Sequence, residues 1–279
     1  MIKTPKPYPE VYEERLCLFL DILGFKSHVD GSEKSPDKQT KSTYHPLTVA
    51  GLYSALESID RVMNDDVEGI NTTRVVTQFS DSIVVSYKLE ESSALYYMLY
   101  DIYLLQINLI SRGILVRGAI TAGKLIHDKK VVFGPALNES VEFEKIAMHP
   151  RVILSQEIIE LGKSKHAAHH SSNDEEKYIK SLLKRDFDGM FYIDYFSVSP
   201  NEFDEDWHGL LDHMMVLREL IKRLSHLTRS SSLKLKYSWM RQKFNDVSIP
   251  LEKSKYSTFN NLDVPSEHLE RIKLVSPFA

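Results

Sequence analysis

The sequence predicts an α+β protein built on a ferredoxin-like sheet, a split βαβ arrangement with helices on one face, followed by a mainly helical C-terminal extension. Three observations indicate this fold. Apolar segments occur in the order strand, helix, strand, strand, helix, strand over residues 15–126. A short polar tip divides the two middle strands into a hairpin. After residue 207, apolar side chains repeat in steps of three and four, as on one face of a long helix.

Each element is bounded by a change in apolar spacing or by Gly, Pro and Ser. Strands are expected at 15–21, 114–126, 151–154 and 190–196, with a hairpin at 74–87. Helices are expected at 46–64, 92–111, 155–161 and 207–245. Polar loops are expected at 26–45 and 162–177, and an irregular tail after Pro250. We therefore expect a sheet domain at 1–160 and an extension at 161–279, with one strand and a long helix, packed on that domain.

Composition and charge narrow the class of protein. The 279 residues carry 35 basic and 39 acidic side chains, and this net charge of −4 gives no general attraction to nucleic acid or anionic lipid.

Cys17 has no partner for an internal disulfide and lies in an apolar run typical of a buried hydrophobe. The N-terminus lacks the apolar core of a signal peptide. Residues 92–111 are apolar, but Asp101, Gln106 and Asn108 favour a buried helix over a membrane span. We expect a cytoplasmic protein.

Two motifs are set aside. Residues 118–124 match the opening of a phosphate-binding P-loop, but Leu125 stands where that loop needs Ser or Thr, and the segment alternates like continuous strand. His166, His169 and His170 lie in a polar stretch without an apolar framework, which favours a solvated loop over a metal site.

A pair of aspartates is the stronger candidate for chemistry. Asp21 ends the first strand, and Asp81 lies at the tip of the hairpin. In a ferredoxin-like sheet these strands are neighbours, so both carboxylates converge on one edge. Either aspartate alone could simply cap a turn. Two adjacent carboxylates repel unless a cation lies between them, and Mg²⁺ or Mn²⁺ suits such ligands and bridges to phosphates.

Four segments resemble class III nucleotide cyclases. Residues 19–25 (Phe-Leu-Asp-Ile-Leu-Gly-Phe) resemble the family's Asp-Ile-x-Gly-Phe element, and residues 79–82 (Phe-Ser-Asp-Ser) resemble its Gly-Asp hairpin, with Ser80 in place of glycine. Residues 117–123 (Arg-Gly-Ala-Ile-Thr-Ala-Gly) resemble its Arg-x-Gly-Ile-x-x-Gly strand, and residues 133–138 (Phe-Gly-Pro-Ala-Leu-Asn) its Trp-Gly-x-x-Val-Asn segment. The segments occur in family order, and the resemblance covers about residues 13–160.

The resemblance implies a catalytic domain with two divalent metals, Mn²⁺ or Mg²⁺, in each active site. Asp21 and Asp81 would hold the metals with the backbone carbonyl of Ile22, and the amides of Gly24 and Phe25 would approach the triphosphate. One metal would activate the ribose 3′-hydroxyl and the other would clamp the triphosphate during in-line attack on the α-phosphorus.

The resemblance also implies a head-to-tail homodimer with active sites at its interface, in which Asn138 orients the ribose from the opposite subunit. The family's adenine-reading Lys and acid are replaced here by Thr77 and Val131. These side chains cannot reproduce the adenine hydrogen bonds, and a site that lacks them should discriminate strongly against adenine.

A further departure affects the transition state. The arginine that the family places four residues after its asparagine is Glu142 in this chain. The charge of the transition state then needs another cation, for which Arg117, Lys124 and Arg151 are candidates.

With these departures, the sequence resembles one bacterial branch of the family, the pyrimidine cyclases of Pycsar antiphage defence. That resemblance implies conversion of UTP to cyclic UMP, or of CTP to cyclic CMP, and a separate effector protein that the product activates. Thr77 or Phe79 on the hairpin strand would form a wall favouring the smaller base. The alternatives are a catalytically degenerate nucleotide-binding or dimerisation module, which Glu142 favours, and a palm-type nucleotidyltransferase, which lacks a Gly-Gly-Asp/Glu-Glu-Phe signature here.

Overall fold

The centre of the molecule is an eight-stranded sheet in the order β2-β3-β1-β4-β6-β8-β7, with β5 paired to β4. The computed structural model describes residues 8–33, 48–64, 73–197, 207–253, 258–259 and 262–279. The strands of the sheet are β1 (Glu13–Ile22), β2 (Val75–Phe79), β3 (Ser82–Lys88), β4 (Val116–His127), β5 (Val132–Phe133), β6 (Val152–Leu154), β7 (Leu183–Arg185) and β8 (Phe191–Ile193).

The first four long strands form the predicted ferredoxin-like core. β1 pairs antiparallel with both β3 and β4, and β2 pairs antiparallel with β3. The helices of this core are α2 (Val49–Asn64) and α3 (Ala94–Ser111), which connect β1 to β2 and β3 to β4. The split βαβ order that the alternation of apolar segments predicts is therefore confirmed.

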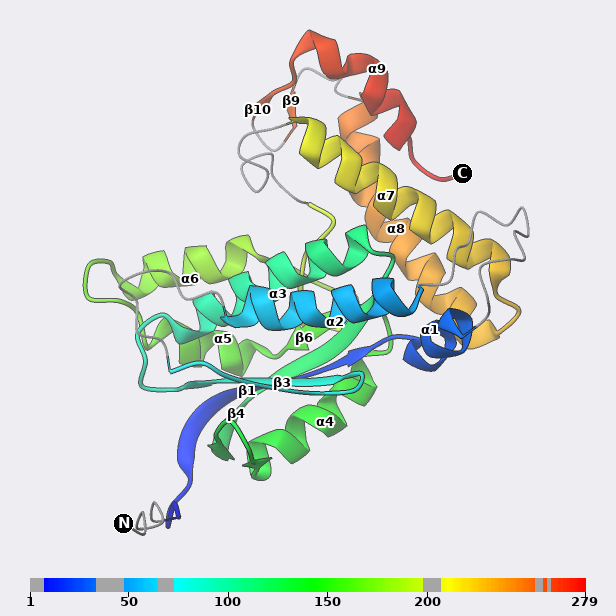
Figure 1. The fold of residues 1–279 in the computed structure, drawn as a ribbon. Helices are drawn as coiled ribbons and strands as arrows, with labels where there is room; N and C mark the ends of the chain where they lie inside the picture. The colour runs from blue at the N-terminus through cyan, green and yellow to red at the C-terminus, as the bar shows by residue number, and fades with distance from the viewer. Residues whose placement is uncertain (1–7, 34–47, 65–72, 198–206, 254–257, 260–261) are drawn as a thin grey trace.

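The two faces of this sheet are covered differently. Figure 1 shows α2 and α3 along one face and α4 (Pro135–Ala147) alone on the other. The alternation of β1 explains the division, because successive side chains of a strand point to opposite faces. Leu16, Leu18 and Leu20 join the main hydrophobic core, whereas Cys17 joins a smaller cluster with Val84 under α4. Burial raises the pKa of the Cys17 thiol to about 11, as expected for a buried hydrophobe.

Two segments predicted as loops contain helices. Helix α1 (Phe25–Ser32) occupies part of the predicted loop 26–45, of which residues 34–45 lie outside the described residues. It begins at Gly24, whose left-handed φ of 73° turns the chain sharply out of β1, and it buries His28 and Gly31. Helix α6 (Ser172–Ser181) occupies part of the predicted loop 162–177 and begins with a capping box between Ser171 and Asp174.

The C-terminal part also differs from expectation. The predicted helix at 207–245 is a hairpin of two helices, α7 (Trp207–Leu227) and α8 (Ser231–Lys253), broken in a polar run at 228–230. The predicted strand at 190–196 is the shorter β8, and β7 was not predicted. Both belong to the main sheet, which therefore continues past residue 160, itself inside α5 (Gln156–Lys163). Beyond α8 follow β9 (Thr258–Phe259), β10 (Leu262–Asp263), η2 (Ser266–His268), α9 (Leu269–Ile272) and η3 (Lys273–Val275), where an irregular tail was expected.

Two further expectations are confirmed. The apolar segment at 92–111 is the core helix α3, and none of the helices that the structure describes is long and apolar enough to span a membrane. The segment 118–124 lies inside strand β4 and not between a strand and a helix, so it is not a P-loop.

Candidate active site at the end of the first strand

The two candidate metal ligands lie at one edge of the sheet. Asp21 is opposite Ser82 of β3 on one side and Arg117 of β4 on the other. The backbone amide of Ile22 donates a hydrogen bond of 3.0 Å to the carbonyl of Asp81, which ties the hairpin tip to the end of β1. Asp81 therefore lies beside the end of β1, as its position at the hairpin tip predicts.

The hairpin tip contains a residue with an unusual backbone. Ser80 has a φ of 57°, in the left-handed region that glycine adopts most easily. This geometry explains why a glycine suits the position in the family that the hairpin resembles. Serine keeps the tight tip at a cost in backbone strain, and the geometry that presents Asp81 is retained.

At this edge of the sheet, which we call the acidic edge, the charges of two other carboxylates act on Asp21. Burial is the largest cause that raises the pKa of Asp21, followed by the neighbouring charges of Glu144 and Asp81, and together they bring it to about 6. Arg117 and Lys236 act in the opposite direction. Because the charges of Glu144 and Asp81 both disfavour an ionised Asp21, the edge favours a bound cation.

The donor set fits a small hard cation. Within the described residues no side chain donates a hydrogen bond to the carboxylate of Asp21 or Asp81, so their oxygens remain available. No group of three or more His, Cys, Asp or Glu side chains in the described part of the chain is arranged to hold a metal by itself. Mg²⁺ typically takes one or two carboxylates and completes its coordination with water and phosphate oxygens, so two carboxylates suffice when a phosphate ligand is present.

A cleft opens directly beside this edge. It has a volume of about 340 Å³, and its wall includes Gly24, Ser27 and His28 from the start of α1 and Lys236 from α8. The first amides of a helix have no partners within the helix and carry the positive end of its dipole. The start of α1 therefore lies at this cleft, with Gly24 on its wall.

The basic residues near the edge are not equally available. Arg117 forms an ion pair with the buried Glu144 of α4. Arg151 is 1% exposed and is bound to Asp186 and Asp188, so it cannot reach a substrate. Lys124 is opposite Glu14, roughly 20 Å of strand away from Asp21 along β1.

Lys236 is the cation that the sequence did not reveal. It belongs to α8, far from Asp21 in the chain, and no motif marks it. Its pKa is lowered, chiefly by burial and then by Arg117, while Glu144 and Asp21 act to raise it. These charge partners put Lys236 beside the acidic edge.

Asn138 lies elsewhere on α4. Glu144, which influences Asp21, is about two helical turns later, so Asn138 is roughly 9 Å away along the axis and on a different face of the helix. Its side chain is exposed. Within one copy of the chain, Asn138 and the acidic edge therefore do not form a single site. Glu142 is also exposed and pairs with Lys145.

A hydrogen-bonded chain ends at Thr77, one of the expected base-reading residues. Arg15 Nε donates to Ser86 Oγ at 2.8 Å, Ser86 Oγ lies 2.7 Å from His127 Nδ1, and His127 Nε2 lies 3.0 Å from Thr77 Oγ1. The end of β4 therefore turns beneath β2 and β3 on the face that α4 covers. Burial, with a contribution from Arg15, lowers the pKa of His127 to about 4, so its ring is neutral near pH 7.

Only the first of these hydrogen bonds has a fixed direction. Arginine can only donate, so Ser86 Oγ accepts from Arg15 Nε. The contacts of His127 with Ser86 and Thr77 run in opposite directions in the two tautomers of the neutral ring, because a hydroxyl can both donate and accept. In the tautomer with its proton on Nε2, His127 donates to Thr77 Oγ1, and the Thr77 hydroxyl keeps its own proton. His127 was not predicted, because its sequence neighbours give no sign of this contact.

The other expected base-pocket residues are exposed. Phe79 ends β2 with 82% of its surface exposed, on the same strand face as Thr77. Val131 lies in the turn after β4, where its amide bonds to the side chain of Asp128. Because His127 is opposite Val132 in the β4–β5 pair, Val131 is close to the His127 end of the chain of hydrogen bonds.

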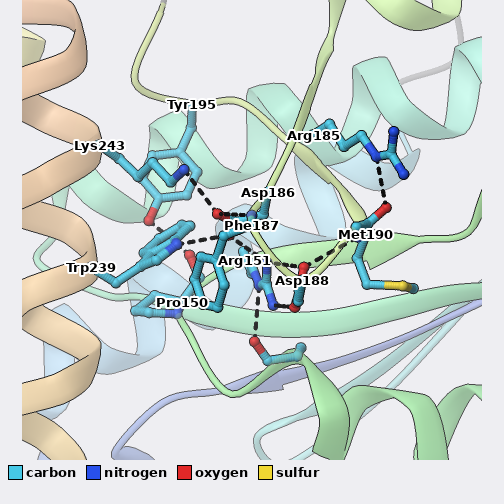
Figure 2. Close-up of polar contacts among 12 residues, drawn as sticks. Pro150, Arg151, Arg185, Asp186, Phe187, Asp188, Met190, Tyr195, Trp239 and Lys243 are labelled. Atoms are coloured by element: carbon cyan, nitrogen blue, oxygen red, sulfur yellow. Dashed lines mark hydrogen bonds and ion pairs between the residues drawn. The ribbon is translucent and has the colours of Figure 1, made fainter.

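A buried polar cluster fixes α8 against the sheet domain (Figure 2). Asp186 binds Arg151, accepts a 2.7 Å hydrogen bond from the indole of Trp239, and forms a 2.9 Å ion pair with Lys243. The Trp239 ring also stacks on His149, with ring centroids 5.1 Å apart and planes 3° from parallel. Two residues of α8 are thus bound to the segment just before β6 and to the β7–β8 turn.

Comparison with known proteins gives a structural likeness but no match in sequence. No protein-family model matches this chain, and no curated protein matches it in sequence. Among solved structures, the chain is similar to the catalytic core of a rhodopsin-guanylyl cyclase with converted specificity, in complex with ATPαS. The two share 13% sequence identity with a TM-score of 0.39, and the match covers 66% of this chain and 96% of the other. The functional argument therefore rests on the residues of this chain.

Proposed function

We propose that this chain is a pyrimidine nucleotide cyclase that converts UTP to 3′,5′-cyclic UMP and pyrophosphate. The observation that carries the proposal is the convergence of Asp21 and Asp81 at one edge of a ferredoxin-like sheet, beside a cleft at the start of α1. The four sequence segments that resemble class III cyclases support it. A retained pair of mutually repelling acids also favours an enzyme over a degenerate module, because a fold without a metal gains nothing from that repulsion.

The proposed reaction is an internal phosphoryl transfer. The ribose 3′-oxygen attacks the α-phosphorus, the bond from that phosphorus to the bridging oxygen of the β-phosphate breaks, pyrophosphate leaves, and the hydroxyl proton passes to water. Two divalent cations, Mn²⁺ or Mg²⁺, supply charge neutralisation and a lowered pKa for the 3′-hydroxyl when bound. Asp21, Asp81 and the Ile22 carbonyl hold them, and the Gly24 and Phe25 amides bind phosphate oxygens.

The second half of each site comes from a second copy of the chain. Asn138 of the partner subunit orients the ribose, because the Asn138 of the same copy is turned away from the acidic edge. Exposed apolar side chains, Phe79, Ile146 and Met148 among them, support a homodimer. Arg117 is held by Glu144 and acts as a positioning residue for the acidic edge.

We assign His127 the tautomer that donates to Thr77, and this assignment favours uracil over cytosine. The Thr77 hydroxyl then offers its own proton, which complements the 4-carbonyl of uracil. The bulk of Phe79 on the same strand face favours a one-ring base. Thr77, Phe79 and Val131 are the proposed base-pocket residues.

The test is incubation of the purified protein with Mn²⁺ and each of the four ribonucleoside triphosphates separately, with the products resolved by mass. Cyclic UMP from UTP is the expected product. Cyclic CMP alone would replace the substrate by CTP, the second candidate. If no cyclic product forms from any of the four triphosphates, the degenerate nucleotide-binding module, which Glu142 favours, replaces the enzyme.

Replacing Thr77 with valine is expected to lower kcat/KM for UTP by roughly tenfold to a hundredfold, because the base carbonyl loses its donor while the shape is kept. Turnover of CTP should change little. Thr121→Val makes the same replacement on β4, where the hydroxyl bonds to the carbonyl of Ala136, and should leave the UTP-to-CTP ratio unchanged. An unchanged ratio in Thr77→Val would contradict the assignment of Thr77.

Mixing two inactive variants tests the shared sites. Asp81→Ala and Asn138→Ala are each expected to be inactive or nearly so, and an equal mixture should recover about a quarter of the wild-type rate, because half of the dimers then hold one intact site. A mixture of Asp21→Ala and Asp81→Ala should recover nothing, since both changes damage the same half-site. Equal rates in the two mixtures, after subunit exchange is verified, would exclude a composite site.

The proposed product acts as a second messenger in antiphage defence in the cytoplasm, by activating a separate effector protein. The resemblance of residues 19–25 and 79–82 to the Pycsar pyrimidine cyclases supports this role. We propose no direct contact with nucleic acid or membrane.

A further inference from the structure

The helical hairpin of α7 and α8 brings a lysine to the acidic edge. Lys236 shares the wall of the 340 Å³ cleft with Gly24, Ser27 and His28, and its nearest charges include Arg117, Glu144 and Asp21. No described residue forms a hydrogen bond or ion pair with its ammonium group. The helical hairpin, which also contributes Leu224, Leu233 and Tyr237 to the cleft wall, therefore adds a cation there.

The position of Lys236 is fixed by the neighbouring turn of α8. Trp239 lies three residues later, hence on the same side of the helix, and is held by Asp186 and by stacking on His149. Lys243, one turn further, is bound to the same carboxylate (Figure 2). Pro150, next to His149, forms part of the cleft wall, so the cluster and the cleft are adjacent.

The cleft has the donors of an anion site. Part of its otherwise largely apolar wall is the start of the eight-residue helix α1, which has no side-chain cap; the Ser27 amide bonds to the Gly24 carbonyl, and the helix amides before it have no partner among the described residues. His28 supplies an independent sign: it is 9% exposed, lines the cleft, and its Nδ1 has no hydrogen-bond partner within the described residues. A buried polar atom without a partner is costly unless a ligand or water satisfies it.

We propose that this cleft binds the β- and γ-phosphates of the substrate and that Lys236 is their charged ligand. This inference rests on the proposed function for the identity of the substrate, but the site itself would bind any polyphosphate with its divalent cation. Lys236 then supplies a positive charge, which the site needs because Glu142 stands where the resembled family has an arginine. Its ammonium group stays bound to the pyrophosphate while the bond to the α-phosphorus breaks. The helical hairpin thereby adds a phosphate ligand to the half of the site that this copy of the chain supplies.

The test measures binding without turnover. Inorganic tripolyphosphate with Mn²⁺ is titrated by calorimetry into the full-length wild type and into Lys236→Met, Lys236→Arg and Lys234→Met. Loss of one charge-assisted contact should weaken binding roughly tenfold to a hundredfold in Lys236→Met. Lys236→Arg should recover part of it. Lys234, exposed on the same helix and absent from the cleft wall, provides the matched control and should bind as the wild type does.

The outcomes separate the two proposals. Tripolyphosphate binding by Lys236→Met within twofold of the wild type overturns the inference, whatever the enzyme makes. A wild type that produces no cyclic nucleotide, but whose tripolyphosphate binding depends on Lys236, overturns the proposed function and keeps the site. In an active enzyme, Lys236→Met should reduce kcat/KM for UTP and CTP by the same factor, because a phosphate contact carries no information about the base.

Discussion

Replacing Asp21 with asparagine is expected to stabilise the metal-free protein while lowering turnover by roughly a thousandfold or more. The pKa of Asp21 is raised from 3.8 to about 6, first by burial and then by Glu144 and Asp81. A carboxyl group whose pKa is higher in the folded state favours folding when protonated, below about pH 4, and that contribution is lost as the pH rises through 6. At pH 7.5 the charged Asp21 therefore destabilises the fold by on the order of 1–3 kcal/mol.

Thermal unfolding with a chelator present measures this effect. Asp21→Asn should melt a few degrees above the wild type at pH 7.5, and the difference should disappear near pH 4. Asp30→Asn, an exposed change on α1, should shift neither value. Added Mn²⁺ should raise the melting temperature of the wild type but not of Asp21→Asn. A lower melting temperature for Asp21→Asn at pH 7.5 would show that the charged Asp21 does not destabilise the fold.

The largest loss of stability is expected at Asp186. Its side chain is fully buried and binds Arg151, Trp239 and Lys243 together. Asp186→Ala leaves the Arg151 charge buried without its main partner, which typically costs about 3–5 kcal/mol. Asp186→Asn keeps the shape and loses only the charge, so most of the loss should remain.

Urea unfolding measures the loss in free energy of unfolding for Asp186→Ala, and limited proteolysis shows which segment becomes accessible. The α7–α8 hairpin should become more susceptible to cleavage in Asp186→Ala, because the contacts that fix α8 are lost. Glu142→Ala removes an exposed pair with Lys145 and should change the free energy of unfolding by less than about 0.5 kcal/mol. If Asp186→Ala unfolds like Glu142→Ala, the cluster does not hold the hairpin.

The sequence predicts the four-stranded core because each of its strands carries its own signal. A continuous apolar run defines β1, alternating residues define β4, and the polar pair Ser80-Asp81 interrupts an otherwise apolar stretch. The placement of Asp21 near Asp81 follows from topology alone. For this reason the acidic edge is the part of the candidate site that can be predicted from the sequence.

The remaining features depend on contacts between distant segments. Helix α1 follows a left-handed glycine and has little apolar periodicity, so its helical state comes from packing. The run Asp186-Phe187-Asp188-Gly189 before β8 is a turn signal that could have revealed β7. Lys236 and His127 had no such signal, because an isolated lysine or histidine acquires its role only from neighbours that the fold brings to it.

The hydrogen-bonded chain from Arg15 to Thr77 bears on how base preference could change. The residues linked to Thr77 lie on β1, β3 and β4, whereas Thr77 itself is on β2. A change of the His127 tautomer exchanges donor for acceptor at its contact with Thr77 while Thr77 stays in place. If Thr77 reads the base as proposed, substitutions of His127 or Ser86 inside the sheet should alter the UTP-to-CTP ratio, and a substitution at the exposed Phe79 should leave the contact between His127 and Thr77 unchanged.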